Sequence, residues 1–129
     1  MKPGLVALLD LVCVLVFAAI GRASHGEDLG PVGLAATTWP FAAGWLVGWV
    51  VVLVVRAARA RPLAVLAGTL VWLPTVIVGM VLRAVSGAGV ETSFVVVATV
   101  VLGLFLLGWR GVARLVLRSR RASGARGAV

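Results

Sequence analysis

The sequence is poor in the residues that build catalytic and metal sites. It contains one cysteine, one histidine, no tyrosine and only four acidic residues among 129. A lone cysteine, Cys13, excludes an internal disulfide and a cysteine-based metal site. The chain also lacks a Gly-x-Ser-x-Gly nucleophile elbow, a phosphate-binding glycine loop and a paired-acid motif. We therefore expect no enzyme, no catalytic residue, no cofactor and no bound metal.

Charge is scarce and apolar residues are abundant. Only 12% of the residues are charged and 62% are hydrophobic, with a mean hydropathy of +1.16. A soluble domain of this size cannot hide so much apolar surface from water. The hydrophobic residues form four blocks of roughly bilayer-spanning length, and in hydrocarbon each block must be helical because no water satisfies free backbone groups. We place the spans at residues 4–21, 38–55, 63–82 and 94–110.

Short links between the blocks place consecutive helices side by side. The sequence thus predicts an all-α, polytopic membrane protein whose single domain is an antiparallel bundle of four transmembrane helices. The helix of the fourth span should continue to Leu117 along the membrane surface. Residues 119–129 are predicted to form a basic, disordered tail.

The net charge of +8 is distributed asymmetrically. Ten basic residues lie before the first span, between the second and third, or after the fourth, whereas the alternate loops hold only Arg22 and Arg83. The positive-inside rule then places both termini in the cytoplasm. Arginine outnumbers lysine eleven to one, which is typical of a GC-rich bacterial genome and makes the membrane a plasma membrane.

The first apolar block also has features of a signal peptide. Lys2 supplies a positive start, and Gly21 and Ala23 are small residues around a possible cleavage site. Asp10 argues against cleavage, because a carboxylate at the centre of an apolar segment weakens insertion by about 2.5–3.5 kcal/mol. We favour a retained span, and the mass of the purified N-terminus distinguishes the two.

Asp10 is the only acid inside an apolar block and lies about 8 Å from the cytoplasmic end of its helix. Its carboxylate can pair with Arg56 or Arg110, remain protonated and hydrogen-bonded, or serve as a proton or ion relay. We favour the pair, because only threonines accompany Asp10 inside the spans and a continuous relay is hard to draw. The candidate intramembrane polar site consists of Asp10, Arg56 and Arg110.

A second group of polar residues lies at the outer face. Arginine there can hold an anion, but the acids of the same loops favour ion pairs. Residues 22–37 form the longest loop, and on length alone they are the best candidate for a partner surface. The segment "HGED" is only a weak metal signal. The candidate outer-face anion or ion-pair cluster consists of Arg22, His25, Glu27 and Arg83.

The segment "GWLVGWVVV" places two glycines four residues apart, which lets a neighbouring backbone approach inside the chain or in a homodimer. Three tryptophans near mid-membrane can pack as a core or line an apolar cavity, whereas Trp39 and Trp109 suit the interfacial belt. Pro74 should kink the third span. The predicted helix-packing residues are Gly44, Gly48, Trp45, Trp49, Trp72 and Pro74.

The two outer loops have weakly similar sequences. "GRASHG" follows the first span and "LRAVSG" follows the third, which suggests two helical hairpins related about the membrane normal. The matching residues are few and of common types, so we favour chance similarity over a duplication.

The chain also resembles a known family. Asp10 and the stretches "FAAIGRASHGE", "TTWPFAAGWLVGW", "VWLPTVIVGMVLR", "FVVVA" and "LLGWR" are similar to the prokaryotic integral-membrane family described as domain of unknown function 3054. The resemblance implies a small multi-spanning membrane protein and no particular activity, ligand or catalytic residue.

Two functions fit these features. The first is a structural or accessory membrane component that self-associates or joins a larger membrane complex. The alternative is a small transporter or channel-like protein that uses Asp10 and the outer arginines. The expected partners are the lipid bilayer, with anionic headgroups at the basic tail, and other membrane subunits. No nucleic acid is expected, because no aromatic residues interleave with the tail arginines.

Overall fold

The computed structural model describes residues 1–127, with side chains described up to Gly124. Within this part of the chain every regular element is a helix, so the all-α prediction is confirmed. The helices are α1 (Pro3–Ser24), α2 (Pro31–Val54), α3 (Arg56–Ala60), α4 (Val65–Val85) and α5 (Thr92–Gly127).

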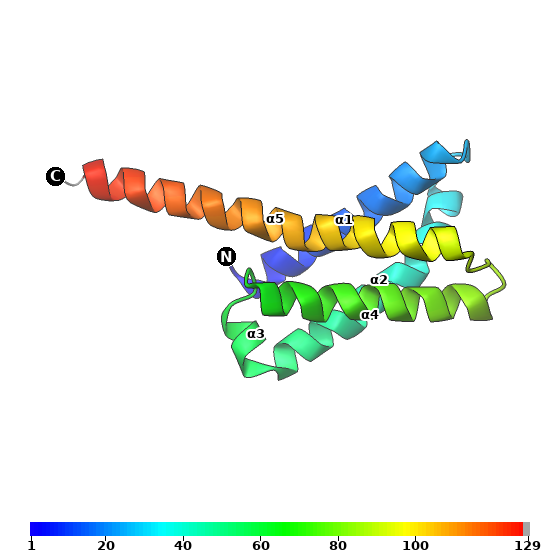
Figure 1. The fold of residues 1–129 in the computed structure, drawn as a ribbon, viewed down its shortest axis with the longest axis horizontal. Helices are drawn as coiled ribbons and strands as arrows, with labels where there is room; N and C mark the ends of the chain where they lie inside the picture. The colour runs from blue at the N-terminus through cyan, green and yellow to red at the C-terminus, as the bar shows by residue number, and fades with distance from the viewer. Residues whose placement is uncertain (128–129) are drawn as a thin grey trace.

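Four of these helices, α1, α2, α4 and α5, are long and apolar enough to cross a membrane. They run in alternating directions (Figure 1), as expected for a multi-pass membrane protein. The N-terminus and α3 lie at one end of the bundle, which we call the terminus end. Residues 25–30 and 86–91 connect helices at the opposite end, which we call the loop end.

The helix α2 begins seven residues earlier than the predicted start at residue 38. Pro31 occupies the first turn, where its missing N–H costs nothing, and Pro40 lies inside the helix instead of at its start. A bilayer helix tolerates an internal proline because neighbouring groups satisfy the freed carbonyl. The predicted 16-residue loop at 22–37 is therefore reduced to residues 25–30, and length no longer marks it as a partner surface.

Both loop-end turns use the same helix-ending motif. Gly26 and Gly87 have φ of +67° and +79°, a left-handed conformation that glycine adopts without strain. The N–H groups of the next residues bond back to the carbonyls of Arg22 and Arg83 at 2.9 and 3.0 Å, which closes a Schellman motif in each case.

The similarity between the two outer loops extends to the bounds of the helices next to them. A shift of 61 residues moves the end of α1 at Ser24 onto the end of α4 at Val85, and the start of α2 at Pro31 onto the start of α5 at Thr92. The hairpins α1–α2 and α4–α5 thus have matching turns and matching helix bounds next to each turn.

The helix α5 continues well past the predicted end of its span. It extends through the residues expected to be disordered, as far as Gly127, and projects beyond the rest of the bundle (Figure 1). Its 36 residues correspond to about 54 Å of helix. No proline interrupts residues 111–127, and each residue added to an existing helix gains a backbone hydrogen bond. Residues 128–129 of the predicted tail lie outside the described residues.

The closest helix contact joins α2 to α4 and depends on the two glycines of "GWLVG". A Cβ atom on Gly44 would lie 2.6 Å from the carbonyl oxygen of Pro74, and one on Gly48 would lie 2.8 Å from the Cα of Val71. The backbones can approach this closely only without side chains at these positions. Gly44 and Gly48 are therefore used inside the chain, which leaves them unavailable to a homodimer.

Candidate functional site

Asp10 lies on the inner face of α1. The buried residues of this helix follow a spacing of three and four that includes Val6, Asp10 and Val14, so the carboxylate points into the bundle. The side chain of Asp10 is 0% exposed. A carboxylate in this position requires partners, because an isolated charge in an apolar medium costs several kcal/mol.

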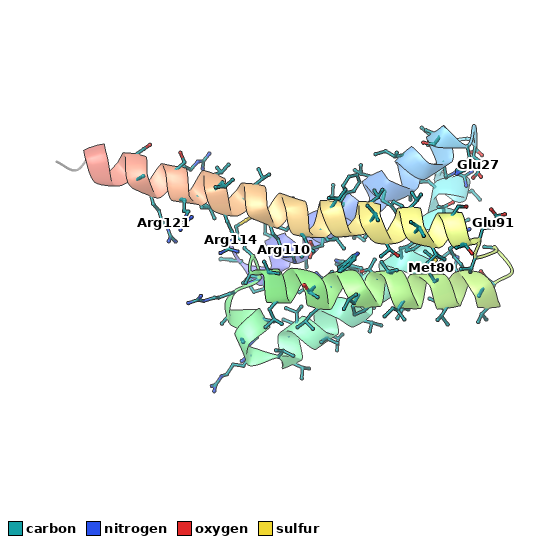
Figure 2. All side chains as sticks on the ribbon, viewed as in Figure 1. Glu27, Met80, Glu91, Arg110, Arg114 and Arg121 are labelled. Carbon is teal, nitrogen blue, oxygen red and sulfur yellow. The ribbon has the colours of Figure 1, made fainter. Side chains whose placement is uncertain are left out.

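Arg110 of α5 supplies the counter-charge. Its Nη1 and Nη2 atoms donate to Oδ1 and Oδ2 of Asp10, each at 2.7 Å, in a two-pronged ion pair. Arg110 is itself only 2% exposed (Figure 2 shows its position in the bundle). This geometry is the strongest form of arginine–carboxylate contact, because two parallel hydrogen bonds are both charge-assisted.

Two tryptophans complete the coordination of the carboxylate. The indole N–H of Trp109 donates to Oδ1 at 2.8 Å, and that of Trp49 on α2 donates to Oδ2 at 2.9 Å. Each carboxylate oxygen of Asp10 thus accepts two hydrogen bonds. A carboxylate offers about four acceptor positions, so all of them are occupied.

Two further N–H groups of Arg110 donate to backbone carbonyls. Its Nε atom donates to the carbonyl of Pro62 at 2.9 Å, and Nη1 donates a second bond to the carbonyl of Leu106 at 2.7 Å. Gly68 of α4 makes room for this side chain, since a Cβ there would lie 3.0 Å from Cδ of Arg110. We call Asp10, Trp49, Trp109 and Arg110 together the clasp. It joins α1, α2 and α5 to the link between α3 and α4.

Arg56 lies outside the clasp. Its side chain is exposed at the start of α3, and it is absent from the hydrogen bonds and ion pairs of the described residues. Of the three residues predicted for the intramembrane polar site, the structure brings together Asp10 and Arg110 only. The α2 helix ends at Val54, so Arg56 follows a break in the chain direction instead of ending the span.

Sequence reasoning missed the tryptophans of the clasp. Trp109 was assigned to the interfacial belt and Trp49 to core packing, yet both indole N–H groups bind Asp10. The usable signal is chemical: a buried indole N–H needs an acceptor, and Asp10 is the only carboxylate within the spans. The Pro62 carbonyl carries no sequence signal, because any residue has one.

Two further tryptophans link helices by the same type of bond. The indole N–H of Trp45 donates to the carbonyl of Ala7 on α1, and that of Trp72 donates to the carbonyl of Thr99 on α5, each at 2.9 Å. The mid-membrane tryptophans thus fasten neighbouring helices through fixed polar contacts.

At the loop end, Arg22 is enclosed by its own loop. Its guanidinium forms ion pairs with Glu27 at 2.9 Å and Asp28 at 3.0 Å. It also donates to the Asp28 carbonyl at 2.7 Å and to the hydroxyl of Thr37 at 2.9 Å. These partners come from α2 and from the turn, so Arg22 holds the first hairpin closed and has little capacity left for an external anion.

Arg83 is the counterpart of Arg22 in the second hairpin. Its Nε atom donates to the carbonyl of Gly89, six residues onward, as Arg22 does to Asp28. Its guanidinium also lies 4.2 Å from the centre of the Phe94 ring, a cation–π contact. Arg83 therefore packs against its own hairpin, and the structure does not bring it to Glu27.

His25 is the last member of the predicted outer-face cluster. His25 is the C-cap residue at which α1 ends, and its side chain is exposed and takes no part in the Arg22 ion pairs. Among residues 1–124, no group of three His, Cys, Asp or Glu side chains lies in a metal-binding arrangement. The four residues of this predicted cluster thus do not form one site. Arg22 with Glu27 holds the first hairpin closed and Arg83 holds the second, and we call these two groups the hairpin locks. His25 is exposed.

Two hollows on the described surface both involve α5. One, of about 540 Å³, lies on its projecting part and is lined by Gly111, Arg114, Leu115, Leu117, Arg118 and Arg121. The other, of about 550 Å³, is an open apolar depression between α4 and α5, where Trp72 and Gly103 meet. Neither is lined by Asp10, so the clasp is not the wall of either hollow.

One comparison with known proteins identifies the family of this chain. The family model of DUF3054, a protein of unknown function, matches residues 7–113, and the chain belongs to this family. The match includes the whole clasp and both hairpin locks. No curated protein and no solved structure matches the chain.

Proposed function

We propose that this DUF3054 member is a non-catalytic structural or accessory component of its membrane. The observation that supports this most directly is the saturated clasp. Asp10 is the most plausible residue for proton or ion transfer, and all four acceptor positions of its carboxylate are filled by Arg110, Trp49 and Trp109. A carboxylate in that state serves to hold helices in place, because accepting a proton or a cation requires breaking charge-assisted bonds.

The polar groups of the bundle support the same proposal. The hydroxyls of Thr69, Thr75 and Thr99 each donate to a carbonyl one turn earlier in their own helix. They therefore do not line up into a chain of exchangeable donors leading away from Asp10. A transporter or channel, the alternative function, needs such a path or a water-filled cavity.

Self-association belongs to the proposal, but it requires a surface other than Gly44 and Gly48. Those glycines already pack against α4, so replacing one with leucine should disrupt the monomer before it alters any oligomer. Subunit counting of fluorescently labelled protein in vesicles tests self-association directly.

We also propose that both termini lie in the cytoplasm, with the plasma membrane as location. The support is the basic terminus end: Lys2, Arg56, Arg59 and Arg61 lie there with the arginines of α5. Cysteines introduced at Ser24 and Ser123, both exposed, test this in a Cys13→Ala background. The Ser24→Cys protein should react with an impermeant thiol reagent in intact cells and the Ser123→Cys protein should not. The opposite pattern overturns the orientation.

A flux measurement tests the accessory role against the transport alternative. Purified protein is reconstituted in vesicles carrying an internal pH dye, and a proton gradient and a membrane potential are imposed. We expect proton flux equal to that of protein-free vesicles. A flux that wild-type protein sustains, and that Asp10→Asn abolishes without loss of helicity, would overturn the proposal in favour of transport.

A further inference from the structure

Most of the positive charge on the described projecting part of α5 lies on one face, and Arg120 lies off that face. Arg110, Arg114, Arg118 and Arg121 are spaced by four, four and three residues, so at about 100° per residue their side chains fall within one quarter of the helix circumference. The side chain of Arg110 is buried in the clasp, whereas the other three side chains are exposed. Figure 2 shows Arg110, Arg114 and Arg121 following one another along the same edge of α5.

The opposite face of the same segment is apolar and exposed. Val112, Leu115 and Val116 are 61%, 65% and 46% exposed. At the same helical spacing Val112 and Val116 lie roughly opposite the three arginines, Leu115 lies between the two faces, and Arg120 borders Val116. An exposed helix with a basic face and an aliphatic face is the arrangement of segments that bind at a membrane surface.

No acid of this protein neutralises these arginines. The sequence has four acids in all: Asp10 is paired in the clasp, Glu27 and Asp28 pair with Arg22, and Glu91 lies at the loop end. Among the described residues, the terminus end therefore has exposed cations and no exposed carboxylate. Because no acidic side chain balances the projecting helix, its exposed arginines are available to an external anion.

We propose that residues 111–121 of α5 form a binding site for anionic lipid headgroups in the leaflet at the terminus end. Arg114 lies one turn, about 6 Å, beyond the buried Arg110, which is the depth of the headgroup layer. The guanidinium groups of Arg114, Arg118 and Arg121 bind lipid phosphates.

The hollow on this segment has the composition that such a ligand requires. It combines three arginines with Leu115 and Leu117, so a headgroup phosphate and the first carbons of an acyl chain both find matching groups. Proteins with basic segments next to a span gain about fivefold in affinity for anionic membrane per charge near the surface. This inference goes beyond the accessory role, which the bundle can fulfil whether or not α5 binds lipid.

The test compares two variants of equal charge. One replaces Arg114, Arg118 and Arg121 with glutamine, and the matched control makes the same change at Arg56, Arg59 and Arg61 of the α3 link. Each protein is reconstituted in phosphatidylcholine vesicles that contain traces of spin-labelled phosphatidylglycerol or spin-labelled phosphatidylcholine. Electron spin resonance then measures the fraction of each labelled lipid that the protein immobilises.

We expect wild-type protein to immobilise more phosphatidylglycerol than phosphatidylcholine, and added salt to reduce the difference. The α5 variant should lose this preference and the α3 control should keep most of it. A preference that survives in the α5 variant, or that falls equally in both variants, overturns the proposal. So does tighter binding of a fluorescent RNA oligonucleotide than of phosphatidylglycerol vesicles by wild-type protein. Equal melting temperatures show that the variants are folded, and the salt response of wild-type protein is an independent measurement.

Discussion

Replacing Asp10 with asparagine preserves the size of the side chain and removes its charge. In the clasp, Oδ1 accepts from Trp109 and Arg110, and Oδ2 accepts from Trp49 and Arg110. Asparagine has one oxygen and one NH2 group. Whichever way its amide is turned, one indole N–H and one guanidinium N–H face the NH2 group, where no hydrogen bond is possible.

The cost follows from the burial of Arg110. Each buried donor left without an acceptor costs about 1–3 kcal/mol, and Arg110 keeps a charge that nothing balances. Removing one partner of a buried ion pair typically costs about 3–5 kcal/mol. We expect Asp10→Asn to lower the free energy of unfolding by that amount. Arg110→Met should have a similar effect, because it leaves the Asp10 carboxylate with two indole donors and no counter-ion.

The double variant distinguishes a charge pair from two unrelated packing contacts. Asp10→Asn combined with Arg110→Met leaves no buried charge, so it should be no less stable than either single variant. The coupling energy of the cycle should be about 3 kcal/mol or more. Reversible unfolding in mixed detergent micelles, followed by far-ultraviolet circular dichroism, provides the measurement.

Arg56→Met is the matched control for this cycle. It removes the same charged group from an exposed position, so stability should change by no more than about 0.5 kcal/mol. The reasoning is refuted if the two clasp losses add in the double variant to within about 0.5 kcal/mol, because independent sites behave that way.

Two other predictions concern helix packing, with the same unfolding measurement. Gly44→Ala and Gly48→Ala should each destabilise the bundle by about 1–3 kcal/mol, since the new Cβ meets α4 backbone at 2.6 and 2.8 Å. Gly21→Ala, with open space at its Cβ, should be neutral or stabilising by up to about 1 kcal/mol; equal effects at all three sites contradict the close contact. Trp72→Phe should cost about 1 kcal/mol through loss of the bond to the Thr99 carbonyl, and an unchanged stability would show that this bond contributes nothing.

The spans were predictable because hydrophobicity is a local property of the sequence. All four apolar helices lie where the blocks predict them, and their centres need no knowledge of the fold. Their ends were less predictable. The start of α2 was misplaced because Pro40 resembles a helix start, whereas Pro31 performs that role. The end of α5 was misplaced because a basic sequence predicts exposure to solvent but not whether the helix stops.

The candidate site was only partly predictable. A carboxylate within a span needs a partner of opposite charge, and this requirement alone selected Arg56 and Arg110 as candidates. Choosing between them required the path of α5 beside α1, which places Arg110 within 2.7 Å of Asp10. The indole donors of Trp49 and Trp109 were missed because an aromatic residue in a span fits packing, lipid contact and hydrogen bonding equally well.

The sequence by itself determined that the chain suits a lipid bilayer instead of water and that its apolar segments are helical. It also determined that the charge of Asp10 must be neutralised. These follow from the dehydration cost of backbone and charged groups, which depends on residue type and not on neighbours. The tertiary structure decided which groups meet the need. In the folded bundle, Gly44 and Gly48 pack against α4, and Arg22 and Arg83 each bind groups of their own hairpin. Asp10 pairs with a residue 100 positions away. Such choices depend on distances between helices, and those exist only once the bundle has packed.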